Sequence, residues 1–156
     1  AILGIGAGWF QRDYDEYGYR FGTWTDRFDA FEQNLPVIRE RWSKLNPKPT
    51  RDIPILIGGG GEKKTLRLTA LYADMWNGFG GPDDFRHKND VLDRWCAEVG
   101  RDPKAIERTA SINPEDIDRL DDFVDAGITH MILGVGSPFD LDDVARMVEW
   151  RDARNK

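Results

Sequence analysis

The 156-residue sequence is poor in cysteine: Cys96 stands alone, so no disulfide can form within the chain. No apolar run approaches the roughly 18 residues that a membrane helix needs. Basic residues are in deficit, with 22 Lys and Arg against 28 Asp and Glu, which argues against nucleic acid and anionic membranes as general partners. No His, Cys, Asp and Glu group has metal-site spacing, so we expect no metal. With no signal peptide in view, these features predict a cytoplasmic protein.

Apolar residues are plentiful, because 40% of the chain is hydrophobic and 12% is aromatic. That content is enough for one domain with its own core over residues 1–156. Five short apolar runs are typical of buried parallel strands, because they barely alternate with polar residues. The runs are Ile2–Gly6, Ile55–Gly59, Met75–Phe79, Ala110–Ile112 and His130–Val135.

Between these runs, apolar residues recur at helical spacing. The predicted helices are Thr25–Trp42, Glu62–Ala73, Pro82–Val99, a segment from Pro114 to Gly127, and a last helix that opens at Asp140. Pro36 lies within the first of them and predicts a kink or a break. In the last helix we expect Leu141, Val144 and Val148 to be buried.

Strands that alternate with helices predict right-handed βαβ units and a parallel sheet. Two α/β architectures fit this order, a (β/α)8 (TIM) barrel and a doubly wound sheet. A complete barrel takes about 250 residues. In the barrel interpretation the chain therefore supplies about five βα units of a partial TIM barrel, and the N-terminal strands are missing.

Two glycine clusters each follow a predicted strand, one at Gly4–Gly8 and one at Gly58–Gly61. Glycine lets a ligand approach the backbone closely, and a helix start offers free N–H groups. The second cluster leads into a helix and so predicts a phosphate cradle, although a tight turn is the simpler alternative. Trp9 and Lys63 occupy positions where a dinucleotide fingerprint and a P-loop need glycine, so neither motif applies.

Four segments in chain order resemble the luciferase-like monooxygenase family, and most closely its deazaflavin (coenzyme F-420) dependent oxidoreductases. The segments are Leu3–Trp9, Pro54–Leu66, Tyr72–Asn77 and Asp125–Gly134. The resemblance implies an incomplete luciferase-like (β/α) barrel over residues 1–156, with the cofactor at the carboxyl ends of the strands. Reduced F-420, or alternatively FMN, would transfer hydride to a small organic substrate or support its oxygenation.

The resemblance also implies which residues bind the cofactor. The residues expected beside its ring system are Gly6, Ala7, Gly8, Trp9 and, near a position that often contacts the cofactor, Arg12. The residues expected to hold its phosphate are Gly59, Gly60, Gly61 and Glu62. No catalytic acid or base can be named from the sequence.

Trp76 and Asn77 follow the third apolar run and are candidates for the substrate pocket, with core packing and a turn as the respective alternatives. The first and last strands would form open sheet edges. We expect a missing N-terminal segment or a second copy in a homo-oligomer to cover them. Two other functions stay open: a non-catalytic remnant that binds a phosphorylated ligand, and an assembly piece completed by another chain.

Overall fold

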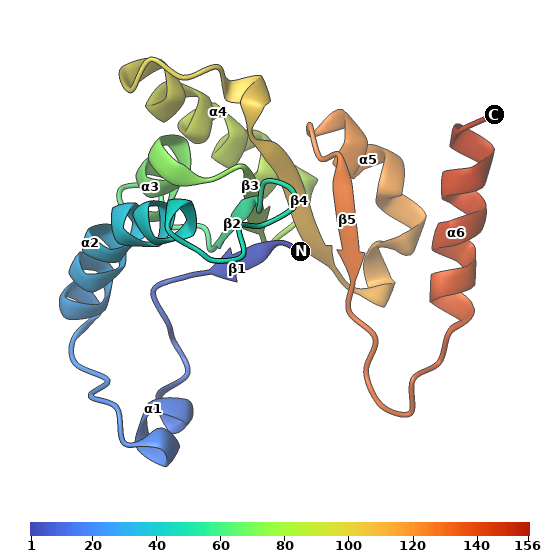
Figure 1. The fold of residues 1–156 in the computed structure, drawn as a ribbon. Helices are drawn as coiled ribbons and strands as arrows, with labels where there is room; N and C mark the ends of the chain where they lie inside the picture. Colours follow the sequence, from blue (N-terminus) through green and yellow to red (C-terminus); the bar gives the residue numbers. More distant parts are fainter.

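All five predicted apolar runs contribute strands to one parallel sheet. The computed structural model describes residues 1–156. The strands are β1 (Leu3–Ile5), β2 (Ile55–Gly58), β3 (Met75–Gly78), β4 (Glu107–Ile112) and β5 (His130–Leu133). Their order in the sheet is β1-β2-β3-β4-β5, so each strand pairs with the next one in sequence (Figure 1).

This strand order decides between the two architectures. Right-handed crossovers that always step in the same direction place every connecting helix on the same face of the sheet. A doubly wound sheet instead reverses its strand order partway through. The sheet therefore has the winding of a (β/α) barrel, and the doubly wound alternative is wrong. β1 and β5 are the two open edges, as the sequence predicted.

Helices occupy each connection between strands. They are α1 (Gln11–Tyr17), α2 (Trp24–Ser43), α3 (Thr65–Tyr72), α4 (Pro82–Glu98), α5 (Leu120–Asp125) and α6 (Asp142–Arg154), with short 3-10 helices at Pro103–Ala105 and Pro114–Arg119. The helix predicted from Pro114 to Gly127 is thus divided into a 3-10 turn and α5. None of these helices combines the length and the apolar character that crossing a membrane requires.

The core lies between the helices and one face of the sheet, in two clusters. The larger cluster joins α3, α4 and α5 to β3 and β4. At its centre the Phe85 ring makes edge-to-face contacts with Trp76 and with Phe123, each with 5.8 Å between the ring centroids. The smaller cluster packs α2 and α3 against Ile55 and Ile57 of β2. The opposite face of the sheet carries the alternate residues and has no helix over it.

Two further local predictions differ from the structure. α2 runs through Pro36 without a break, and the neighbouring Leu35 is buried in the smaller core cluster. β4 begins at Glu107 rather than Ala110, because the polar residues Arg108 and Thr109 are buried with hydrogen-bond partners. A hydrophobicity pattern does not identify polar strand residues whose hydrogen-bond partners lie elsewhere in the chain.

The last helix does not bury the predicted side chains. Leu141 is 63% exposed and Val148 is 39% exposed, while Val144 is half-buried. α6 instead packs through Met147 and Trp150 against the larger core cluster. The difference arises because α6 follows the edge strand β5 and has a packed neighbour on one side only.

Candidate functional site

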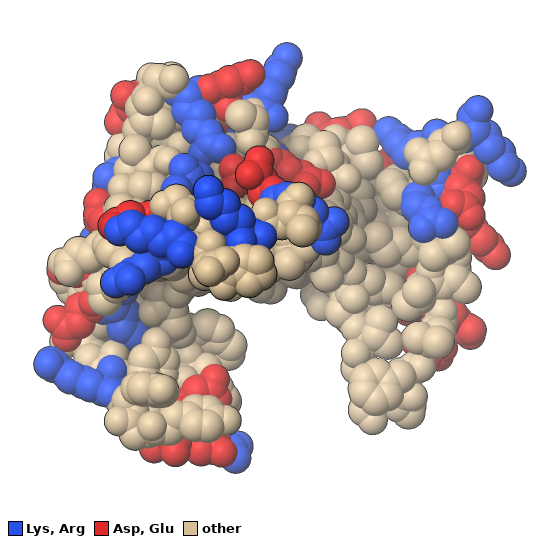
Figure 2. Space-filling model, in the orientation of Figure 1, with Lys and Arg blue, Asp and Glu red and all other residues tan.

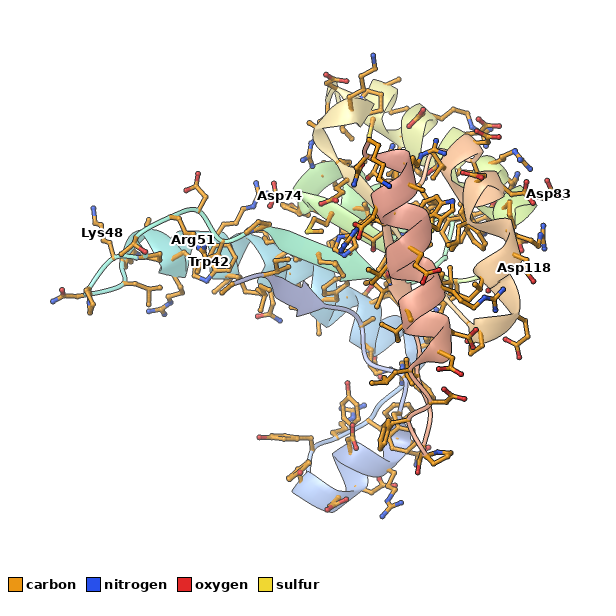
Figure 3. All side chains as sticks on the ribbon, turned by 90° about the vertical axis from the view of Figure 1, so that its right-hand side faces the viewer. Trp42, Lys48, Arg51, Asp74, Asp83 and Asp118 are labelled. Atoms are coloured by element: carbon orange, nitrogen blue, oxygen red, sulfur yellow. The ribbon has the colours of Figure 1, made fainter.

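The carboxyl ends of β1 and β2 bring the two glycine clusters together. A side-chain carbon built on Gly6 would lie 3.7 Å from the carbonyl oxygen of Gly58, so the two chain segments are in direct contact. Figure 3 separates the two rims of the sheet: Arg51 and Asp74, which precede β2 and β3, lie on one side, and Asp83 and Asp118, which follow β3 and β4, lie on the other.

The loop after β2 presents a row of free backbone donors. None of the amides from Gly60 to Lys64 donates a hydrogen bond to another protein atom. The turn closes with the Leu66 amide donating to the Gly61 carbonyl at 3.0 Å, and α3 follows directly. Adjacent free N–H groups next to a helix N-terminus form an anion-binding arrangement. The loop for which the sequence predicts a phosphate cradle therefore offers free main-chain donors.

Two tryptophans hold this loop in place through their indole nitrogens. Trp76 Nε1 donates to the Gly59 carbonyl at 2.8 Å, and Trp95 Nε1 donates to the Glu62 carbonyl at 2.7 Å. Gly59 has a φ of 118°, which favours glycine, and its amide donates to the Asn77 carbonyl at 3.0 Å. The loop is consequently fixed at both ends while the amides between remain free.

Charges around the loop are partly paired. The Glu62 carboxylate accepts from Lys88 Nζ at 2.6 Å and contacts His87 Nε2 at 3.0 Å. The hydrogen bond from Lys88, followed by that of His87, holds the pKa of the Glu62 carboxyl below its usual value. Lys64 pairs with Asp29 at 3.2 Å, whereas Lys63 is exposed and forms no ion pair. Lys63 is thus the uncompensated cation next to the free amides.

The loop after β1 depends on a residue that sequence reasoning missed. Arg27, on α2, donates through Nε to the Gly8 carbonyl at 3.1 Å and through Nη1 to the Gly22 carbonyl at 3.1 Å, and its guanidinium lies 3.8 Å from the centre of the Phe21 ring. Gly8 itself has a φ of 74°, and a side chain there would collide with the Tyr14 hydroxyl. No local sequence signal links Arg27 to the Gly8 carbonyl, which lies 19 residues away.

The other residues predicted at this loop are differently placed. Gly6 and Ala7 line a cavity of about 590 Å³ between the end of β1 and α2. Trp9 is 79% exposed and packs against Phe10, with 5.3 Å between the ring centroids. Arg12 is exposed on α1, which projects from the rest of the molecule in Figure 1, and it forms no ion pair.

A second cavity, of about 470 Å³, lies at the carboxyl ends of β3, β4 and β5. Its lining comprises Phe79, Gly80, Ser111, Ile112, Asn113, Asp116, Ile132 and Gly134. Figure 2 shows an open gap between the part of the molecule that carries α1 and the part that carries the loop from β5 to α6, and the surface beside this gap is mainly uncharged. Sequence reasoning did not single out Ser111, because a serine within an apolar strand carries no motif of its own.

The two residues predicted to form a substrate pocket have different positions. Trp76 is 1% exposed and belongs to the larger core cluster, so its ring packs in the core and its nitrogen supports the glycine loop. Asn77 is half-buried on the opposite face of β3. Its amide donates to Ser111 Oγ at 3.1 Å, and Ser111 lines the second cavity.

Comparisons with known proteins place these features in context. The model of the luciferase-like monooxygenase family matches residues 1–115. Uncharacterised proteins of Mycobacterium bovis and Mycobacterium tuberculosis are 27% identical to the chain over 153 residues, which is 89% of this chain and 52% of theirs. The chain therefore spans about half the length of the curated relatives it matches.

Solved structures share the fold at low sequence identity. A coenzyme F-420 dependent tetrahydromethanopterin reductase from Methanopyrus kandleri has a TM-score of 0.68 at 15% identity, over 94% of this chain and 71% of that one. An F-420-dependent secondary alcohol dehydrogenase has a TM-score of 0.63 at 16% identity, over 95% and 60%. A riboflavin lyase with modified FMN has a TM-score of 0.52 at 9% identity, over 72% and 35%. These likenesses confirm the barrel type of fold.

Proposed function

The chain belongs to the luciferase-like monooxygenase family, and from that membership we propose that it forms the cofactor-binding part of an oxidoreductase that uses F-420 or, alternatively, FMN. The observation that carries the proposal is the row of free amides from Gly60 to Lys64. A phosphate group is the part of either cofactor that such a row binds best.

The solved structures of similar fold support the choice of cofactor class. Two of them are named as F-420-dependent enzymes, and a third holds a modified FMN. Both cofactors combine a phosphate with a fused-ring system, so one phosphate loop, here residues 59–64, would suit either. We give F-420 priority because the two structures with the higher TM-scores use it.

The residues of this chain would bind and orient the cofactor. The amides of Gly60 and Gly61 would donate to the phosphate, and Lys63 would add positive charge. Gly6 and Ala7, without bulky side chains, would let the ring system approach the end of β1. The bound cofactor supplies the hydride or the reaction with oxygen. The Trp76 and Trp95 hydrogen bonds keep the phosphate loop in position during this chemistry.

The open sheet edges indicate that the isolated chain is not the whole working enzyme. Strands β1 and β5 each lack a neighbour on one side, and Ile2 and Ile132 beside these edges are 52% and 41% exposed. Exposed edges of parallel sheets pair readily with further strands. We propose that additional chain, either from the same protein or from a second copy, covers them in the working enzyme.

The test is a titration of the chain with F-420, FMN and inorganic phosphate. Quenching of the six tryptophans reports binding, and nitrogen-15 NMR spectra report which amides respond. We expect saturable binding of one cofactor, competition by phosphate, and shifts of the amides of residues 60–64. Lys63→Ala should weaken binding about fivefold, whereas Lys48→Ala, an exposed lysine on the opposite rim (Figure 3), should leave it unchanged.

Each other result has a definite meaning. Phosphate binding at residues 60–64 without binding of either cofactor would favour the remnant that holds a phosphorylated ligand. Cofactor binding that leaves these amides unshifted would contradict the assignment of the phosphate loop. A chain that binds none of the three ligands, but forms a stable dimer, would favour the assembly alternative.

A further inference from the structure

A line of polar side chains crosses from β3 to β4 on the face of the sheet that carries no helix. Thr109 Oγ1 donates to Asn77 Oδ1 at 2.8 Å, and Asn77 Nδ2 donates to Ser111 Oγ at 3.1 Å. The sheet register pairs Asn77 with Thr109, and Ser111 lies two positions further along β4 on the same face. Ser111 ends the line at the cavity of about 470 Å³.

The direction of the hydrogen bonds along this line follows from the burial of Thr109. Thr109 has no exposed surface, and the only acceptor that its hydroxyl reaches is Asn77 Oδ1. If the Asn77 amide were turned round, its nitrogen would face Thr109 and the buried hydroxyl proton would lose its acceptor, which is costly. Asn77 must therefore present its N–H to Ser111. Ser111 Oγ accepts that bond, so its own proton is free to point into the cavity.

The lining of the cavity restricts what this proton can bind. Phe79, Ile112 and Ile132 supply apolar walls. The only charged residue among the lining side chains is acidic, Asp116. With no Lys or Arg present, an anionic ligand would meet repulsion without compensation. The surroundings favour a neutral ligand with an apolar body.

We propose that the Thr109–Asn77–Ser111 line presents the Ser111 hydroxyl as a hydrogen-bond donor to a neutral acceptor oxygen of a ligand in this cavity. Ser111 is then a binding residue, and Asn77 and Thr109 are its positioning residues. The inference rests on the proposed function in one respect: the ligand would be the organic substrate of the proposed oxidoreductase.

Two probes of nearly equal shape test the proposal. Cyclohexanone has an acceptor oxygen, and methylenecyclohexane has a CH₂ group in its place. NMR titration of the wild-type chain should show that the ketone binds about fivefold more tightly than the alkene. The side-chain amide signal of Asn77 should shift with the ketone and stay in place with the alkene. Only the ketone accepts a hydrogen bond from the Ser111 hydroxyl, which in turn accepts from Asn77.

Matched variants test separately whether the Ser111 hydroxyl is needed and whether the direction of its proton is needed. Ser111→Ala should lower the ketone-to-alkene affinity ratio to about one, and Ser111→Thr should preserve it. Asn77→Asp keeps the Ser111 hydroxyl but replaces the donor with a second acceptor, so the Ser111 proton turns toward the carboxylate. This variant should also lower the ratio to about one, with alkene affinity unchanged as the control for an intact cavity.

The result can overturn the inference independently of the proposed function. A Ser111→Ala protein that retains the fivefold preference, or a wild-type chain that binds neither probe, contradicts the donor role. If the cofactor binds while the ketone preference is absent, the inference fails and the proposed function stands. If the preference depends on Ser111 but no cofactor binds, the donor line is supported and the proposed function fails.

Discussion

The indole nitrogen of Trp76 donates a hydrogen bond of 2.8 Å to the carbonyl oxygen of Gly59. Through this contact a side chain of the larger core cluster fixes Gly59, the first residue of the loop after β2. The ring of Trp76 also packs edge-to-face on Phe85, 5.8 Å away, so the loop is anchored to the centre of the core.

Trp76→Phe keeps most of the aromatic packing and removes this donor. We expect the free energy of unfolding to fall by about 1–3 kcal/mol, because the half-buried Gly59 carbonyl loses its partner. Urea unfolding measures the change. Trp150→Phe is the matched control, since Trp150 Nε1 bonds Asp121 at the surface and its loss should cost less than about 0.5 kcal/mol. Equal losses for the two variants would contradict the anchoring role.

Neighbouring glycines in the loop should differ in their tolerance of alanine. Gly59 has a φ of 118°, so Gly59→Ala forces a side chain into strained backbone and should cost about 1–3 kcal/mol. Gly60→Ala places its methyl group 3.8 Å from Lys88 Cε, an ordinary contact, and should change stability by less than about 0.5 kcal/mol. Thermal or urea unfolding of the pair checks this, and equal costs would contradict it.

The start of α2 should weaken in acid. Thr23 and Asp26 form a reciprocal capping box, and hydrogen bonds from the Thr23 backbone and side chain hold the pKa of the Asp26 carboxyl below its usual value. A lowered folded pKa means that the stabilisation is fully present above the unfolded value of about 3.9 and is lost as the pH falls through the folded value.

Asp26→Ala should therefore destabilise the protein by a constant amount between pH 5 and 7, with the difference from wild type shrinking below about pH 4. Urea unfolding of both proteins at several pH values measures it. A difference that grows in acid would have the wrong sign for a carboxylate that is stabilised by folding.

Cys96 should be unreactive in the folded protein. The side chain is fully buried in the larger core cluster, and burial raises the pKa of its thiol, so little reactive thiolate forms. We expect a disulfide reagent to label it at least about a hundredfold more slowly in the native state than in concentrated urea. Labelling at comparable rates would show that the α4 packing opens readily.

The sequence predicted the order of strands and helices well, because buried parallel strands are nearly continuous apolar runs. Strand β2 (Ile55–Gly58) lies within such a run, and the glycines that follow it indicate the loop equally clearly. Arg108 and Thr109 were missed as strand residues, because their partners Asp93 and Asn77 lie 15 and 32 residues away. Periodicity describes local character and contains no information about such distant partners.

The candidate site was predictable only where the backbone itself forms it. Gly60 and Gly61 offer main-chain donors, and glycine in sequence indicates that availability directly. Ser111 and Arg27 act through side chains whose roles depend on which strands and helices become neighbours. The burial predicted for Leu141 was wrong for the same reason, since an amphipathic pattern does not reveal whether a second element packs on it.

The succession of strands along the sheet in chain order has a consequence for how this protein can change. Each βα unit rests on the unit that precedes it, and no connection crosses over another. A unit can therefore be added beyond β1 or β5 while every existing strand pair keeps its register. The sheet can be extended one βα unit at a time, so duplication or fusion of such segments leaves the path of the existing chain unchanged.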